Sequence, residues 1–162
     1  MNIKQYDLKT LLLAAIKSEI ESREIYQGLA RRVKNAILKD RLEFLAKEEE
    51  KHKSYLEEFY RRQFPGEEIK VPQETPVPLP QVDASENRLL SAIVEDAMQA
   101  ELAAKEFYED LKTVLPGREN SRILQILADM EQLHYDILSK ELENIKNFED
   151  YAQSWDMIHV GP

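Results

Sequence analysis

Hydrophobic residues recur every three or four positions along most of the chain, which is the spacing of an amphipathic α-helix. Glycine is scarce, with 4 among 162 residues, so little interrupts the pattern. Asp7 is a suitable N-cap for the first helical segment, and Pro116-Gly117 stops the third. The sequence therefore predicts an all-α protein with four long helices, at about 7–34, 36–63, 85–115 and 120–147.

The helical pattern breaks between the second and third segments, over residues 64–84. Five of the seven prolines lie between Pro65 and Pro80, and proline favours extended backbone over helix. A connector of roughly 20 residues, at about 3.3 Å each, can run the length of a bundle about 40 Å long. Because short turns near residues 34 and 116 make two antiparallel hairpins, we expect one four-helix bundle over 1–148 with a single long crossover.

The final residues, 149–162, are predicted to form a tail after the fourth helix. Tyr151, Trp155 and Ile158 make this segment too apolar to stay in solvent, so we expect it to pack on the bundle or on a partner subunit. His159 has no neighbouring ligand motif and is expected to be a surface or packing residue.

Length, charge and composition narrow the class of protein. A chain of 162 residues makes one domain with a substantial core. The net charge of -9 argues against nucleic acid or an anionic membrane as a partner, and no apolar run is long enough to span a bilayer. The chain has no cysteine, which excludes disulfides and thiolate ligands and fits a reducing compartment, so we expect a cytoplasmic protein whose chemistry uses oxygen and nitrogen atoms.

The two halves of the chain repeat one another. In each half a glutamate precedes a tyrosine by seven residues, and a Glu-x-x-His motif follows, with every second-half residue 82 positions after its first-half equivalent. This repetition indicates an internal duplication of a helical hairpin. The repeated residues are Glu19, Tyr26, Glu49 and His52 in the first half, and Glu101, Tyr108, Glu131 and His134 in the second.

The repeated polar residues lie in the inward phase of their helices. Glu49 and His52, for example, continue the apolar stripe that contains Leu45 and Leu56. Residues equally far from a hairpin turn lie at the same height, so four glutamates and two histidines converge on one level of the core. Four buried carboxylates repel one another and lose their hydration, and apolar packing cannot offset that cost.

Two divalent cations would balance this charge, and neutral imidazoles would complete the ligand set. Glu-x-x-His suits such a site because residues three apart share one face of a helix, so one turn supplies both an oxygen and a nitrogen. The sequence therefore predicts a di-metal site in the core, with the ligands Glu19, Glu49, His52, Glu101, Glu131 and His134.

These residues resemble the ferritin-like di-iron carboxylate proteins, and the Glu-x6-Tyr spacing is similar to that of the rubrerythrin branch. The resemblance covers about residues 7–147. It implies two iron ions, with manganese or zinc as alternatives, held by terminal carboxylates, bridging carboxylates and capping imidazoles. By this resemblance the terminal carboxylates are Glu19 and Glu101, the bridging carboxylates are Glu49 and Glu131, and the capping imidazoles are His52 and His134.

The resemblance also gives roles to the two tyrosines. Tyr26 and Tyr108 would donate hydrogen bonds to ligand carboxylates and orient them. The alternative interpretation is that both are core aromatics whose hydroxyl groups have found partners.

Two features depart from the rubrerythrin pattern. Rubrerythrins proper carry a cysteine-ligated rubredoxin domain that delivers electrons, and a chain with no cysteine lacks one, so the resemblance implies a separate electron-donor protein. The family also carries a further glutamate about one turn after the second-half ligand, where this sequence has Ala104; Ser22 is the matching position in the first half. The resemblance and the apolar tail together favour a homodimer.

Three functions are compatible with the predicted site. The leading expectation is a redox enzyme that reduces peroxide or dioxygen at the di-iron centre. The alternatives are an iron-handling protein or ferroxidase, and a non-catalytic bundle that a metal ion stabilises. The glutamates off the inward stripe, Glu21, Glu48 and Glu50, are expected to be solvated surface charges.

Overall fold

The computed structural model describes residues 3–115 and 117–159, with side chains through Tyr151. Within these residues the regular elements are all helices, and no strand is present. The prediction of an all-α protein is therefore confirmed. The elements are the short 3-10 helix η1 (Ile3–Gln5) and the α-helices α1 (Leu8–Arg32), α2 (Ala36–Gln63), α3 (Leu90–Leu111) and α4 (Arg118–His159).

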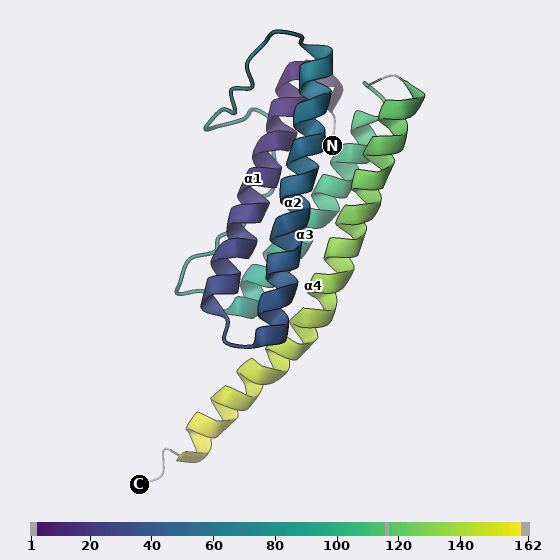
Figure 1. The fold of residues 1–162 in the computed structure, drawn as a ribbon. Coiled ribbons are helices and arrows are strands. Elements are labelled where there is room, and N and C mark those ends of the chain that lie inside the picture. Colours follow the sequence, from purple (N-terminus) through teal and green to yellow (C-terminus); the bar gives the residue numbers. More distant parts are fainter. Residues whose placement is uncertain (1–2, 116, 160–162) are drawn as a thin grey trace.

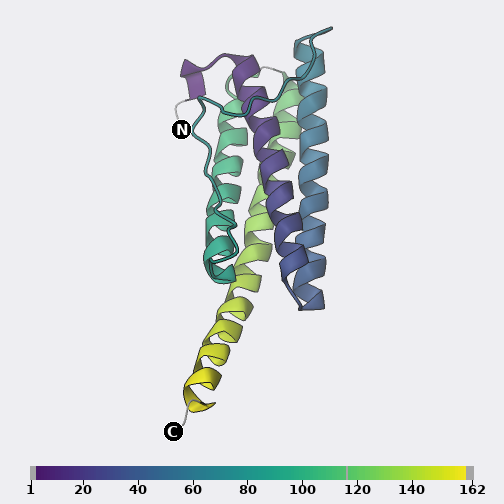
Figure 2. The same cartoon turned by 90° about the vertical axis from the view of Figure 1, so that its left-hand side faces the viewer.

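The four α-helices form two antiparallel hairpins that pack side by side as a bundle (Figures 1 and 2). Helix α1 packs mainly on α2, and α3 packs mainly on α4. Residues 64–89 return along the bundle from the end of α2 to the start of α3, without helix or strand. This crossover is anchored: Val77 is buried, and the Tyr6 hydroxyl donates a hydrogen bond to the carbonyl of Pro76 at 2.9 Å. None of the described helices is long and apolar enough to cross a membrane.

Polar side chains cap the two helices of the first hairpin. The Asp7 carboxylate accepts a hydrogen bond from the amide of Thr10 at 2.9 Å, as predicted for the N-cap of α1. Asn35 caps α2 in the same way, accepting from the amide of Leu38 at 3.0 Å. In the second hairpin, Gly117 has a φ of 121°, a conformation that glycine adopts without steric cost. Pro116 lies outside the described residues.

Helix α3 is shorter than the pattern predicts. It begins at Leu90 instead of near Ser85, because local hydrogen bonds fold residues 83–88 into a turn. The Asp83 carboxylate accepts from the amide of Ser85 at 3.0 Å, and Arg88 donates to the carbonyl of Asp83 at 2.8 Å. Such side-chain bonds compete with helix formation. The helix ends at Leu111, before the predicted end near residue 115.

Helix α4 is longer than predicted. It continues past Asn147 to His159 because residues 148–159 contain neither glycine nor proline. Its 42 residues measure about 63 Å, against about 38 Å for the 25 residues of α1. The side chains of Trp155, Ile158 and His159 lie outside the described residues, so the packing of the tail and the role of His159 stay predictions.

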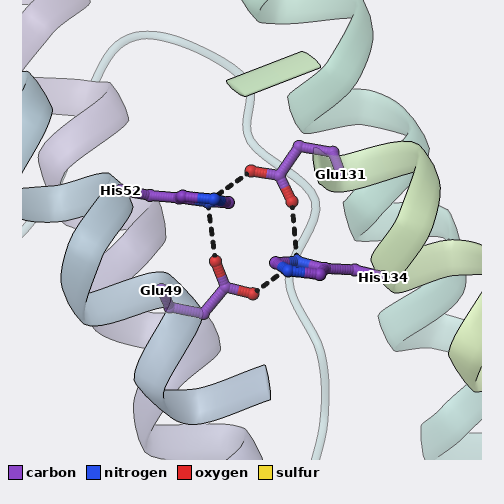
Figure 3. A group of neighbouring side chains, drawn as sticks. All are labelled: Glu49, His52, Glu131 and His134. Carbon is purple, nitrogen blue, oxygen red and sulfur yellow. Dashed lines mark ion pairs between the residues drawn. The ribbon is translucent and has the colours of Figure 1, made fainter. Parts of the chain in front are cut away.

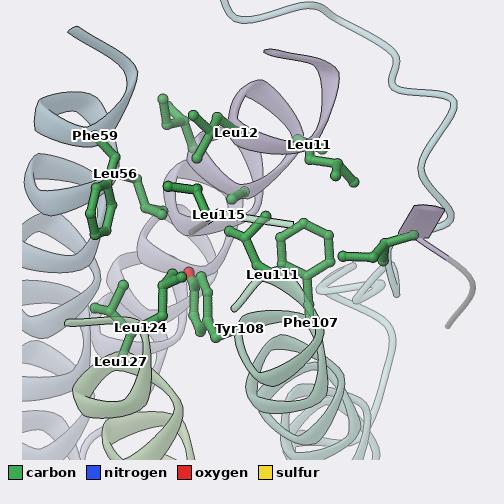
Figure 4. Close-up of a cluster of buried hydrophobic side chains, with 14 of the residues drawn as sticks. Leu11, Leu12, Leu56, Phe59, Phe107, Tyr108, Leu111, Leu115, Leu124 and Leu127 are labelled. Atoms are coloured by element: carbon green, nitrogen blue, oxygen red, sulfur yellow. The ribbon is translucent and has the colours of Figure 1, made fainter. Parts of the chain in front are cut away.

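The apolar core has two clusters, one on each side of the level that holds the predicted ligands. Figure 4 shows the first cluster, which includes Leu12, Leu56 and Leu127. The second includes Leu45 and Leu138, nearer the turn between α1 and α2. Because apolar side chains cover the polar level from both directions along the bundle, its groups are shielded from bulk water.

Candidate metal centre

The six predicted ligands all lie in the interior of the bundle, and none is more than 3% exposed. Each helix of the bundle contributes at least one of them, because each repeated residue occupies the inward phase of its helix. Glu19 comes from α1, Glu49 and His52 from α2, Glu101 from α3, and Glu131 and His134 from α4.

The first histidine faces three carboxylates from three different helices. His52 Nδ1 lies 3.1 Å from Glu49 Oε2 and 3.0 Å from Glu131 Oε1. The same nitrogen is 3.5 Å from Glu19 Oε2. One nitrogen and three oxygens thus gather around one point.

The second histidine has the equivalent surroundings. His134 Nδ1 lies 3.2 Å from Glu49 Oε1 and 3.2 Å from Glu131 Oε2, and it is 3.5 Å from Glu101 Oε2. Glu49 and Glu131 therefore each present one oxygen to each histidine, as Figure 3 shows. The two half-sites share these two carboxylates.

Hydrogen-bonding geometry makes this cluster more compatible with a metal site than with a set of ion pairs. Both ring nitrogens of His52 and His134 and both oxygens of Glu49 are buried without a hydrogen-bond partner among the described residues. The carboxylate oxygens are close to each Nδ1, yet none lies in line with it. These atoms surround a common point, and buried polar atoms without partners require an explanation such as an ion.

Oxygen and imidazole donors in this arrangement fit a pair of divalent cations. One ligand atom from each of Glu49, His52, Glu131 and His134 lies within 4.8 Å of those of the other three residues. Carboxylate and imidazole ligands suit iron, manganese and zinc.

Two tyrosines connect the hairpins at the level of the ligands. The Tyr26 hydroxyl, on α1, donates a hydrogen bond to Glu101 Oε1 on α3. The Tyr108 hydroxyl, on α3, donates to Glu19 Oε1 on α1. In both glutamates the other oxygen, Oε2, faces a histidine, so each tyrosine fixes which oxygen is turned towards the centre.

Burial and crowding shift the pKa values of the acids around the centre. Burial, followed by repulsion from neighbouring glutamates, raises the pKa of Glu19 and Glu101 well above the ordinary value of 4.5. Burial also raises the pKa of the Tyr26 and Tyr108 hydroxyls, which therefore stay protonated and able to donate. For Glu131, burial acts in the same direction, but contacts with the two histidines outweigh it and lower the pKa.

The histidine pKa values move the other way from what burial alone would cause. Burial lowers the pKa of each imidazole, yet the surrounding carboxylates outweigh it and raise the pKa of His134 to about 12. The pKa of His52 is raised for the same reason. The metal-free centre therefore retains protons, and an incoming cation must displace them.

The positions where rubrerythrins carry a further glutamate are placed beside cavities. Ala104 lines a cavity of about 10 Å³ together with Leu79, Pro80 and Tyr108, which is room for about one water molecule. Ser22 lines a surface pocket of about 390 Å³. The sequence pattern could not place the crossover residues next to Tyr108, because extended segments have no period that fixes their contacts.

One of the glutamates expected at the surface is buried. Glu48 is only 8% exposed and pairs with Lys51 at 2.6 Å, so its prediction as a solvated charge is wrong. It lies four residues before His52 and therefore shares the same side of α2, which is the signal that could have identified it. Glu21 and Glu50 remain partly exposed and pair with lysine or arginine.

The fold and the buried cluster together define a ferritin-like four-helix bundle with residues compatible with a di-metal site. The rubrerythrin family model matches residues 10–142, and the chain belongs to the rubrerythrin family. It is similar to a solved structure described as a hypothetical protein, Pfu-1136390-001, from Pyrococcus furiosus. That similarity has 35% sequence identity and a TM-score of 0.78, and covers 91% of this chain and 95% of the other. Among functionally curated proteins, none matches this chain.

Proposed function

We propose that this protein is a di-iron oxidoreductase that reduces peroxide or dioxygen. The observation that supports the proposal is the pair of equivalent donor sets, each with one histidine nitrogen and three carboxylate oxygens, which share Glu49 and Glu131. Two bound iron(II) ions would supply the two electrons that reduction of a peroxide bond requires.

The ligands divide into shared and separate groups. Glu49 and Glu131 would each bridge the two ions, because each has one oxygen beside His52 and the other beside His134. Glu19 would serve the ion at His52 alone, and Glu101 the ion at His134 alone.

The protein would also control proton positions and water near the centre. Tyr26 and Tyr108 hold Oε1 of Glu101 and Glu19, so Oε2 is directed inward. Their raised pKa values keep these hydroxyl protons in place at neutral pH. The apolar clusters on both sides of the centre restrict access to it, so that only small molecules can reach the metal ions.

We propose that the electrons come from a separate donor protein, since the chain has no cysteine to hold an iron–sulfur or rubredoxin-type centre. The lack of cysteine also supports a reducing compartment such as the cytoplasm.

The test is to load the protein with iron(II) without oxygen and to follow ferric absorption in a stopped-flow instrument after mixing with peroxide or with oxygen. Fast ferric formation with either oxidant, limited to the bound iron, is the expected result. Oxidation of iron(II) far beyond the bound amount would favour the ferroxidase alternative instead. Retention of iron(II) with no reaction would contradict the proposal and leave a structural metal site. The variant Glu50→Gln, at the surface of the same helix, is the matched control.

A further inference from the structure

The predicted metal centre is closed to solvent in most directions. None of its six ligand residues is more than 3% exposed, and the two apolar clusters cover it along the axis of the bundle. A reactant must therefore enter between two helices. The crossover, residues 64–89, runs along the bundle (Figure 2), and its residues Leu79 and Pro80 line a cavity together with residues of both α1 and α3.

This cavity lies beside the centre. Its volume is about 10 Å³, which is room for about one water molecule. Tyr108 lines the cavity, and the Tyr108 hydroxyl donates to the ligand Glu19. Ala104, also in its wall, lies one helical turn after the ligand Glu101. A molecule in the cavity is thus next to groups that hold or supply two of the six carboxylate and imidazole ligands.

A surface pocket adjoins the cavity on its outer side. The pocket has a volume of about 390 Å³ and includes Ser22 of α1 and Val82 of the crossover. Ser18, Pro80 and Ala100 line both the pocket and the cavity. Because three residues border both spaces, the two are neighbours, and together they form a passage from the surface towards Tyr108.

The crossover supplies the large aliphatic side chain in the wall of the passage. Leu79 lines the cavity and packs against the first apolar cluster. The neighbouring positions of α1 and α3 are mainly small: Ala15, Ser18, Ala100, Ala103 and Ala104. Leu79 lies in a segment without helix or strand. The width of the passage therefore depends on one leucine, which backbone hydrogen bonds of a regular element do not hold in place.

We propose that this passage is the route by which the oxidant reaches the centre, and that Leu79 restricts it to molecules as small as hydrogen peroxide or dioxygen. The inference rests on the proposed function. Reduction of a hydroperoxide breaks its O–O bond, takes one electron from each of two iron(II) ions and two protons, and leaves water with either a second water or an alcohol. Hydrogen peroxide and alkyl hydroperoxides share this chemistry, so the passage selects between them by size.

A comparison of two peroxides tests the restriction at Leu79. In stopped-flow measurements on the iron(II)-loaded full chain, the wild type should react about 100-fold faster with hydrogen peroxide than with tert-butyl hydroperoxide, and Leu79→Ala should lower this ratio about tenfold. The matched control is Ile69→Ala, the same kind of change at a crossover residue that packs against the same cluster but does not line the passage. An unchanged ratio in Leu79→Ala, or an equal fall in Ile69→Ala, would overturn the role of Leu79.

Filling the cavity tests the route itself. Ala104→Leu should slow ferric formation with hydrogen peroxide by about tenfold or more, because the added side chain occupies the space beside Tyr108. Elemental analysis should give the same metal content as in the wild type. The control Ala92→Leu makes the same change on α3 away from the passage and should react at the wild-type rate. Fast ferric formation in Ala104→Leu with its metal bound would show that the oxidant enters elsewhere.

Azide binding to the cobalt(II)-loaded protein tests the passage without redox chemistry. The visible spectrum of cobalt(II) changes when a further ligand binds, so absorbance gives the rate of azide association. Ala104→Leu should slow this rate, Leu79→Ala should raise it, and Ile69→Ala should leave it unchanged. A protein that follows this order but reduces no peroxide would contradict the proposed function and retain the passage. A protein that reduces hydrogen peroxide equally fast in all variants would contradict the passage and retain the function.

Discussion

The two hairpins agree at the centre of the bundle and differ just outside it. At the centre, glutamate, tyrosine and Glu-x-x-His recur unchanged 82 residues apart. Outside, Arg23 corresponds to Lys105 and Glu50 to Gln132. Arg23 and Glu50 form an ion pair, whereas Lys105 donates to the neutral amide oxygen of Gln132 at 3.0 Å. The outer contact has kept its place and changed its chemistry, whereas the inner residues have kept both.

The difference shows which positions depend on specific chemistry. An outer pair needs only a donor and an acceptor within reach, and exposed pairs contribute about 0–1 kcal/mol. The inner residues must supply two equal donor sets, and each set takes atoms from both hairpins: His52 of the first hairpin faces Glu131 of the second. Neither hairpin can therefore complete the centre alone.

The largest effect is expected from removing a shared carboxylate. Glu49→Ala or Glu131→Ala should abolish binding of at least one metal ion and weaken the other, because each glutamate faces both histidines. Elemental analysis after metal loading and desalting measures the outcome. Two tightly held ions in both variants would show that these carboxylates do not bridge.

The separate carboxylates should affect one ion each. Glu19→Gln should weaken the ion at His52, and Glu101→Gln the ion at His134, by similar amounts. The metal-free proteins should respond in the opposite direction and melt at a higher temperature than the wild type. The raised pKa of each carboxyl group means that the folded state disfavours its charged form at neutral pH, and glutamine removes that cost. Calorimetry with and without metal checks both the weaker metal binding and the higher melting temperature of the metal-free variants. A metal-free variant that melts at a lower temperature than the wild type would contradict the account.

The tyrosines should act across the hairpins. Tyr26→Phe and Tyr108→Phe should each reduce metal affinity by about 10- to 100-fold, as expected for groups that orient a ligand. A double-mutant cycle identifies the partner: Tyr26→Phe should be non-additive with Glu101→Gln and additive with Glu19→Gln, because Tyr26 donates to Glu101. Coupling of Tyr26 to Glu19 instead would contradict its hydrogen bond to Glu101. If neither tyrosine variant changed metal affinity, both tyrosines would be core aromatics without a role at the centre.

Metal affinity should rise with pH. In the metal-free protein the pKa values of Glu19, Glu101 and His134 are all raised, so the centre holds more protons near neutral pH than the same groups would in water, and metal binding must release them. Each proton released makes the affinity about tenfold higher per pH unit. Titration calorimetry in buffers of different ionisation enthalpy counts these protons. A metal affinity that does not change between about pH 6 and about pH 8 would exclude a protonated centre.

The smallest effect is expected at the outer contact. Glu50→Gln gives the first hairpin the kind of pair that the second already has, so the free energy of unfolding should change by less than about 1 kcal/mol. Metal content should be unchanged. A large loss of stability or of bound metal in Glu50→Gln would mean that the outer pair helps to hold the metal centre in place.

The sequence was sufficient to predict the bundle and the convergence of the six predicted ligand residues, because duplication and helical phase constrain both halves at once. It did not predict that each tyrosine donates its hydrogen bond to the other hairpin. Helical phase shows which face of a helix a residue occupies, but it does not show which residue lies opposite across the core. The turn at Asp83 and Ser85 could not be predicted from the spacing of hydrophobic residues, because it depends on side-chain hydrogen bonds. The sequence does not predict the continuation of α4 beyond Asn147, because the apolar residues there indicate a packed tail, although nothing in that segment stops a helix.

The most direct test of the shared centre is metal content per chain after anaerobic loading with iron(II), measured side by side for the wild type, His52→Ala and His134→Ala. The account predicts two ions in the wild type and the loss of one ion in each variant, because each histidine faces one donor set. Binding of a single ion by the wild type, or no stoichiometric binding, would contradict the di-metal centre and leave the duplicated Glu-x-x-His motifs without a function.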